Sequence, residues 1–248
     1  MEGLFAAELT WEEAREAAAA GAVALVPVGS TEAHGPHLPL GTDVIIAAEV
    51  AARAAARLVE AGRRALVFPP LAYGVTEFAA GFSGTVSIRP ETLRALVVDL
   101  ARSLAGQGFG PVVLVNHHLE PDHFAALHAA AAEAAPARVI VPDHRRRPWA
   151  LRLGEEFCTG GSHAGAYETS LVLAASPASV RAVRAALPRL DVDLGKAIKG
   201  GARSFLDLGG DRAYFGDPAA GTAEQGHALY GFHADHVVAL VLDQPPER

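Results

Sequence analysis

Short apolar runs alternate with longer segments of helical periodicity, and this alternation is the feature that most constrains the fold of the chain. Near-continuous Val, Ile and Leu runs of four to eight residues are typical of strands buried on both faces of a parallel sheet. The segments between them are long enough to be crossover helices, as at residues 44–61 and 91–105. The pattern therefore predicts an α/β fold, a layered sandwich in which a mostly parallel central sheet is flanked by helices. The expected strands are residues 22–28, 64–68, 111–115 and 137–141.

Length and composition predict one globular domain spanning residues 1–248, because half of the 248 residues are hydrophobic and no linker interrupts the chain. The formal charge of −7 and the lack of a basic run argue against a nucleic-acid partner. No apolar stretch is long enough to span a membrane, and the first residues lack the features of a signal peptide, which predicts a cytoplasmic protein. Cys158, the single cysteine, is interpreted as a packed or incidental thiol rather than a nucleophile.

The loop at residues 26–43 is unusually rich in side chains that bind metals. Glu32, His34, His37 and Asp43 lie among three prolines and three glycines, directly after the first expected strand. Carboxylates beside imidazoles suit Zn²⁺, Mn²⁺ or Fe²⁺, and the stiff backbone leaves few rotamers to be frozen on binding. The loop therefore predicts a metal site.

Two further clusters support this interpretation. In residues 116–123, His118 and Glu120 are two positions apart after a strand, so both side chains point to the same side. In residues 162–170, His163 and Glu168 precede an apolar, helix-like run. The carboxyl ends of parallel strands share one edge of a sheet, so the first two clusters should meet there. With Asp43 as a possible bridge, the ligand count is sufficient for two metal ions about 3.5–4 Å apart.

Three other regions carry weaker predictions. Residues 70–90 form a long, glycine-rich connection that should help to build the pocket or a subunit contact. Residues 196–218 are predicted to be an irregular excursion near the site or at an interface, before a final helix at about 223–242. The histidines of that helix are expected to face solvent or an interface: His227, His233 and His236.

Taken together, several ordered motifs resemble the creatininase (creatinine amidohydrolase) family over nearly the whole chain. They are Glu-Leu-Thr-Trp at 8–11, the loop ending Leu-Gly-Thr-Asp at 29–43, Phe-Ser-Gly-Thr-Val-Ser at 82–87, Asn-x-His-x-Glu at 116–120 and His-Ala-Gly-x-x-Glu-Thr-Ser at 163–170. The resemblance implies a homohexameric amidohydrolase with a layered α/β fold. It also implies two divalent ions per chain, Zn²⁺, Mn²⁺ or Fe²⁺, and a small-molecule amide as substrate.

The resemblance also implies roles for individual residues. One metal would be held by Glu32, Asp43 and His118, and the other by His34, Asp43 and Glu120, with Asp43 bridging. Many family members have Gly-His-Gly-Gly-Asn in the second cluster, with no counterpart of Glu120, and use the glutamate matching Glu168 as a ligand. Since this chain has both glutamates, Glu168 is assigned to catalysis with His163, although a metal contact stays open for it. His163 would donate the proton that the leaving amine needs, because an ordinary histidine pKa lies near 6.5.

Departures from the family pattern bear on the substrate. Creatininase proper covers its flat ring with tryptophans from the region before the third cluster, where this chain reads Glu-Glu-Phe-Cys-Thr-Gly-Gly at 155–161, and Trp149 is the only tryptophan nearby. His117 and Pro121 also replace a glycine and an asparagine. We therefore expect hydrolysis of a small non-peptide amide other than creatinine. The alternatives are a family peptidase or formamide hydrolase of a cofactor pathway, of the mycofactocin or deazaflavin type, and a metal-binding hexamer without turnover.

Overall fold

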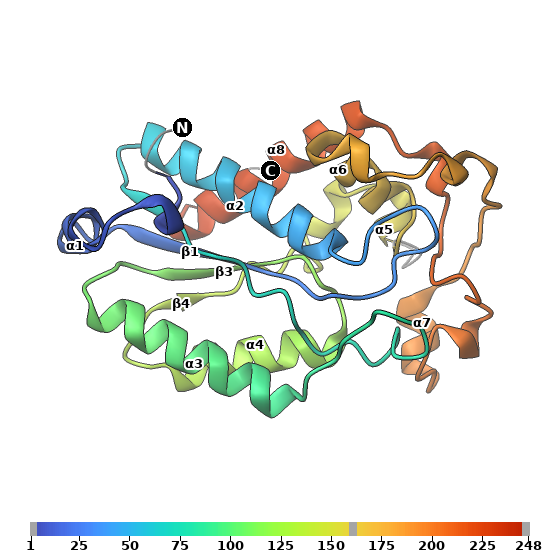
Figure 1. Ribbon diagram of the computed structural model, residues 1–248, viewed down its shortest axis with the longest axis horizontal. Coiled ribbons are helices and arrows are strands. Elements are labelled where there is room, and N and C mark those ends of the chain that lie inside the picture. Colours follow the sequence, from blue (N-terminus) through green and yellow to red (C-terminus); the bar gives the residue numbers. More distant parts are fainter. Residues whose placement is uncertain (1–3, 159–162, 245–248) are drawn as a thin grey trace.

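A four-stranded parallel sheet lies at the centre of the computed structural model, which describes residues 4–158 and 163–244 (Figure 1). The strand order is β2-β1-β3-β4. This arrangement confirms the α/β layered sandwich predicted from the alternation of apolar runs and helical segments. The strands are β1 (Val23–Val28), β2 (Ala65–Val67), β3 (Val112–Asn116) and β4 (Val139–Ile140).

The register between the two central strands positions the functional clusters. β1 pairs with β3 from Ala24 opposite Val112 to Val28 opposite Asn116, so both strands end at the same level. The loop that follows Val28 therefore leaves the sheet beside the loop that follows Asn116.

Helices cover both faces of the sheet (Figure 1). One face carries α2 (Thr42–Glu60), α6 (Ala166–Ala175) and α8 (Ala223–Val241), and the other carries α3 (Pro90–Gly106) and α4 (Pro121–Glu133). The remaining α-helices are α1 (Trp11–Ala19), α5 (Glu155–Cys158) and α7 (Leu194–Lys199). Short 3₁₀ helices are Ala6–Glu8, Trp149–Arg152, Pro177–Ser179, Ala182–Ala186, Leu206–Leu208 and Pro218–Ala220. None of the helices within the described ranges is long and apolar enough to cross a membrane.

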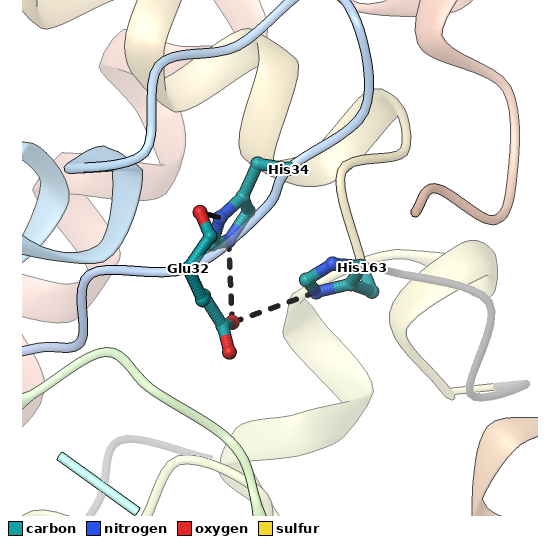
Figure 2. Close-up of side chains that lie close together, drawn as sticks. All are labelled: Glu32, His34 and His163. Carbon is teal, nitrogen blue, oxygen red and sulfur yellow. Dashed lines mark hydrogen bonds and ion pairs between the residues drawn. The ribbon is translucent and has the colours of Figure 1, made fainter. Parts of the chain in front are cut away.

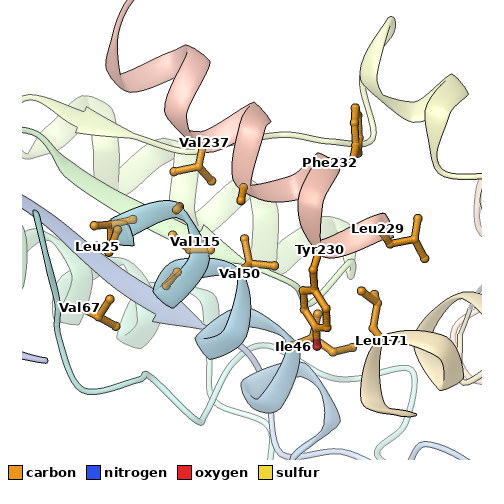
Figure 3. Close-up of a cluster of buried hydrophobic side chains, with 14 of the residues drawn as sticks. Leu25, Ile46, Val50, Val67, Val115, Leu171, Leu229, Tyr230, Phe232 and Val237 are labelled. Atoms are coloured by element: carbon orange, nitrogen blue, oxygen red, sulfur yellow. The ribbon is translucent and has the colours of Figure 1, made fainter. Parts of the chain in front are cut away.

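Alternate residues of β1 feed two separate cores, because successive side chains of a strand point to opposite faces. Leu25 belongs to one core, a cluster that also contains Val50 of α2 and Tyr230 of α8 (Figure 3). Val26 packs on the other face with Leu93 of α3 and other apolar side chains. Burial on both faces explains why β1 is apolar throughout, without the alternation of a half-exposed strand.

Helix α6 packs closely against α8, and a glycine permits this approach. A Cβ atom placed on Gly226 of α8 would lie 2.0 Å from the carbonyl oxygen of Ser170 in α6. Such a contact cannot form without moving one helix, so a side chain at position 226 would separate the two helices. The same displacement would shift Glu168, which lies in the first turn of α6.

We predict that Gly226→Ala destabilises the protein, while a matched glycine substitution does not. Overpacking of this kind costs about 1–3 kcal/mol or more of unfolding free energy. At Gly106, at the end of α3, an added Cβ would have no atom within 4 Å, so Gly106→Ala should be neutral or stabilising by up to about 1 kcal/mol. Urea unfolding of both variants followed by circular dichroism measures the difference. Equal stability of the two variants would contradict the close packing of α6 on α8.

Candidate metal centre

The predicted site residues converge at the carboxyl ends of β1 and β3. The loop after β1 supplies Glu32 and His34, and Asp43 lies in the first turn of α2. The loop after β3 supplies His118 and Glu120. His163 precedes α6, and Glu168 lies in its first turn. Figure 2 shows the Glu32 carboxylate facing the imidazoles of both His34 and His163. Its Oε1 is 3.7 Å from His34 Nε2 and 3.9 Å from His163 Nδ1.

Asp43 connects two imidazoles that come from different loops. Its Oδ1 is 3.2 Å from His34 Nε2, and its Oδ2 is 3.0 Å from His118 Nδ1. The backbone N–H of Ser30 donates to Oδ2 at 3.2 Å. A Cβ on Gly29 would lie 2.8 Å from the Cβ of Asp43, so a glycine is required where β1 passes the start of α2. Asp43 therefore lies between the two imidazoles, the place that a bridging ligand would take.

The hydrogen bonds of the two imidazoles decide which ring nitrogens face the carboxylates. His34 Nδ1 lies 3.2 Å from the carbonyl oxygen of Glu32, and His118 Nε2 lies 2.7 Å from that of Val75. A carbonyl oxygen only accepts, so these nitrogens carry the protons. In the neutral form of each ring, the opposite nitrogen would direct its lone pair at the carboxylates, and the two would repel each other. A cation between them would remove this repulsion.

The pKa values indicate the same need for positive charge. Burial opposes protonation of His34, but Asp43, Glu168 and Glu32 outweigh it and raise its pKa to about 10. Burial likewise opposes protonation of His118, yet Glu32 and Asp43 raise its pKa well above the usual value. Nε2 of His34 is buried and has no hydrogen-bond partner in the described part of the chain. These donors fit divalent cations, whose ligands are neutral imidazoles and ionised carboxylates.

The two glutamates, Glu120 and Glu168, lie beside different imidazoles from those expected when the family resemblance assigned ligands to the two metals. Glu168, not Glu120, lies with His34 and Asp43, and its Oε2 is 3.6 Å from His34 Nε2. The family resemblance assigned Glu120 to the same metal as His34, but Glu120 lies instead with Glu32 and His118. Packing of α6 on α2 and α8 decides the position of Glu168, and the local spacing of the sequence carries no information about that packing.

Burial raises the pKa of both glutamates, to about 7 for Glu120 and about 8 for Glu168. Glu120 accepts hydrogen bonds from the backbone N–H groups of Glu77 at 3.0 Å and Phe78 at 3.3 Å. Glu168 accepts from the N–H of Ala164 at 2.6 Å.

His163 differs from the sequence-based expectation of an ordinary pKa. Burial and the neighbouring His34 lower its pKa to about 4. Its Nε2 lies 3.0 Å from the carbonyl oxygen of Ala33 and therefore carries the proton. The ring is neutral near pH 7, and Nδ1 is left as an acceptor.

A cavity of about 940 Å³ opens onto the cluster. Glu32, Asp43 and His118 line it, together with Glu120, His163 and Glu168. Its aromatic lining within the described residues consists of Phe78, Phe157 and Phe205. Phe78 comes from the 70–90 connection and Phe205 from the 196–218 excursion, so both segments contribute to the pocket as expected. The ring of Phe205 is 4.3 Å from that of His163, which no pattern in the sequence indicated.

The remaining aromatic, histidine and cysteine residues singled out in the sequence lie partly at the cavity and partly away from it. Trp149 does not line the cavity; its ring stacks on His236 at 4.0 Å. The prediction for the last helix was wrong for His233 and His236, which are each only 3% exposed and pack among other rings, while His227 is exposed. His37 is buried and bonds to Thr169 at 3.1 Å, outside the metal-ligating groups. Cys158 is an exposed thiol at the cavity wall. Residues 159–161 of the expected substrate wall and Ser162 of the third cluster lie outside the described residues.

Fold and site together define an α/β protein with a buried carboxylate–imidazole centre at the ends of parallel strands. Residues 7–241 match the family described as Creatininase: Creatinine amidohydrolase, so the chain belongs to the creatininase family of hydrolases. It is 35% identical over 228 residues to the mycofactocin precursor peptide peptidase of Mycolicibacterium smegmatis. The aligned region covers 90% of this chain and 86% of that protein. It is also 35% identical over 193 residues to the creatinine amidohydrolase of Pseudomonas putida, covering 70% and 72%.

The fold matches a solved structure of creatinine amidohydrolase with a TM-score of 0.75 and 26% identity, over the full length of both chains. Two other solved creatininases are described as a manganese form and as a Zn-Zn type.

We predict that Zn²⁺ or Mn²⁺ raises the melting temperature of the metal-stripped protein, because an ion that binds only the folded state stabilises it. The gain is about 2.7 kcal/mol when free ion is 100 times its Kd. Asp43→Ala should abolish the shift, since both imidazoles lose the carboxylate that they share. Asp99→Ala, which removes an exposed carboxylate from α3, should retain it. Differential scanning fluorimetry with and without the ions measures the shift, and an unchanged shift in Asp43→Ala would exclude Asp43 as a ligand.

Proposed function

We propose that the protein is a metal-dependent hydrolase that cleaves an amide bond in a peptide substrate. The observation that carries this proposal is the cavity of about 940 Å³ directly over the carboxylate–imidazole centre. Pockets of about 300–1,000 Å³ hold ligands of drug size, so this one has room for a short peptide rather than a single small ring. The similarity to mycofactocin precursor peptide peptidases over 90% of the chain supports a peptide substrate.

In this proposal Asp43 is shared by two cation sites. Glu32 and His118 complete one site with Asp43, and His34 and Glu168 complete the other, following the distances among these side chains. When bound, divalent cations supply the Lewis acidity that activates water and polarises an amide carbonyl. The second assignment replaces Glu120 by Glu168, because Glu168 is the glutamate that lies with His34 and Asp43.

Glu120 is then available to transfer protons. Two backbone N–H groups hold its carboxylate at the cavity wall, and a pKa of about 7 suits an acid or base that works near neutral pH. His163 is neutral and presents Nδ1 as a hydrogen-bond acceptor at the same cavity. We assign it to orienting the attacking water or the amide N–H of the substrate.

A second candidate function is the hydrolysis of a small non-peptide amide. The 35% identity to the creatinine amidohydrolase of Pseudomonas putida favours it. Against creatinine itself, Trp149 stacks on His236 and does not line the cavity. An aromatic stacking contact is worth about 0.5–1.5 kcal/mol beyond its buried area, so a flat ring would lose this contribution from Trp149 and, among the described residues, could stack only on Phe78, Phe157 or Phe205.

We predict that the Mn²⁺- or Zn²⁺-loaded protein hydrolyses short peptides with a kcat/KM at least about tenfold above that for creatinine, which corresponds to about 1.4 kcal/mol of transition-state binding. Steady-state assays of amine release on tri- to hexapeptides, linear formamides, lactams and creatinine make the comparison. Asp43→Ala serves as the control for contaminating peptidases and should be inactive. Creatinine or a lactam as the best substrate would favour the second candidate function.

We also predict that conservative changes separate the roles of the two glutamates. Glu168→Gln should lower metal content toward one ion per chain, because a neutral amide is a poorer ligand than a carboxylate. Glu120→Gln should retain both ions and lose activity by about 10²–10⁴-fold, the usual contribution of general acid–base catalysis. Elemental analysis and kcat, measured on the same preparations, test both. Loss of an ion in Glu120→Gln but not in Glu168→Gln would favour the assignment implied by the family resemblance, in which Glu120 is a metal ligand and Glu168 is catalytic.

A further inference from the structure

The two lysines of the chain lie in one place. Lysine and arginine together number 21, and only Lys196 and Lys199 are lysines. Both belong to the short helix α7, three positions apart on one face of the turn, and both line the cavity over the metal centre. A chain that otherwise uses arginine for its positive charges thus has its lysines at this cavity.

The basic residues of the cavity differ in whether they are already paired. Arg145 and Arg146 both contact the Asp143 carboxylate, at 2.8 and 3.1 Å. Neither lysine forms an ion pair with any carboxylate among residues 4–158 and 163–244. Two ammonium groups are therefore available at the cavity, whereas the guanidinium groups are already neutralised in part.

Contacts on both sides of α7 tie it to the catalytic region. The Asp193 side chain caps the helix by accepting from the N–H of Lys196 at 2.8 Å. Six residues after Lys199, Phe205 places its ring 4.3 Å from His163, and its N–H donates to the carbonyl oxygen of Phe78 at 2.9 Å. The segment thus folds over the cavity and presents the lysines to whatever occupies it.

We propose that Lys196 and Lys199 bind a carboxylate of the substrate, the C-terminal carboxylate of the peptide whose amide bond is cleaved. This inference rests on the proposed function and specifies its substrate class. Ammonium groups on flexible stems suit a terminal carboxylate whose position varies with the peptide. The metal ligands do not require the lysines, because divalent cations offset the buried carboxylates. The apolar side chains of Phe78, Phe157 and Phe205 would contact the side chains of the same peptide.

Equilibrium binding tests the proposal without requiring turnover. Gly-Leu-Phe with a free carboxylate, Gly-Leu-Phe amide and Gly-Leu-Glu amide are titrated calorimetrically into metal-loaded Glu120→Gln protein. We expect the free acid to bind about tenfold more tightly than Gly-Leu-Phe amide, the effect of one charge-assisted contact of about 1.4 kcal/mol. Adding Lys196→Gln and Lys199→Gln should weaken binding of the acid about tenfold and change that of the Phe amide less than twofold.

Two controls separate a carboxylate site from other causes. Arginine at both positions should keep most of the preference for the acid. The pair Arg15→Gln and Arg63→Gln changes the net charge equally with exposed residues that do not line the cavity, and should leave the preference intact. Metal content of every variant should equal that of the parent protein.

Each outcome decides the proposal. A preference for the acid that survives in the double glutamine variant, as carboxylate binding to the metals would give, overturns it, and so does the absence of any preference or of any binding. Tight binding of the Glu amide alone, lost in the double glutamine variant, overturns the assignment to the C-terminal carboxylate and shows that the lysines bind a side-chain carboxylate instead. Lysine-dependent binding with no cleavage of any peptide by the unmutated enzyme supports the lysine site and counts against the proposed function.

Discussion

The Asp43 carboxylate, held between two imidazoles, is the interaction on which the rest of the site depends. Its two oxygens lie 3.2 Å from His34 and 3.0 Å from His118, residues that come from different strand ends. It sits in the first turn of α2, where the helix dipole favours a negative charge. β1 and β3 end opposite each other, which brings the loop after β1 beside the loop after β3. Gly29, directly after β1, lets the backbone pass close beside Asp43. A shift in any of these elements would separate the ligands.

Surrounding contacts hold this centre in a form that is ready for cations. Thr76 donates its hydroxyl to Glu32, and the Val75 carbonyl fixes the tautomer of His118. The Asn116 side chain donates from Nδ2 to the carbonyl oxygen of His118 and accepts at Oδ1 from the N–H of His118. His123 Nε2 lies 3.0 Å from the same Oδ1. Buried carboxylates cost stability unless they are paired or hydrogen-bonded, and these contacts, with the two apolar cores, maintain the geometry of the candidate centre. An ion that bound there would contribute to folding free energy.

The ligands and the cavity wall come from different parts of the chain, and this division explains how one family holds several activities. The candidate ligands lie at strand ends and at the start of two helices, positions fixed by sheet register and helix packing. The cavity wall comes from the connection at 70–90, the segment at 143–158 and the segment at 193–205, which includes the first part of the 196–218 excursion. Loops tolerate substitution better than the elements that they connect. Relatives described as a mycofactocin precursor peptide peptidase and as a creatinine amidohydrolase are therefore compatible with one carboxylate–imidazole centre.

The sequence by itself determined the layered fold and the residues of the candidate centre, because both follow from local patterns. Apolar runs of strand length predicted all four strands, and the Glu-x-His and His-x-Glu spacings after two of them marked the candidate ligands. Tertiary structure alone decided which glutamate joins which imidazole, since Glu168 reaches His34 only through the packing of α6. It also decided the burial of His233 and brought Phe205 to His163. Such contacts join segments more than 40 residues apart, and no local periodicity records a distance of that kind.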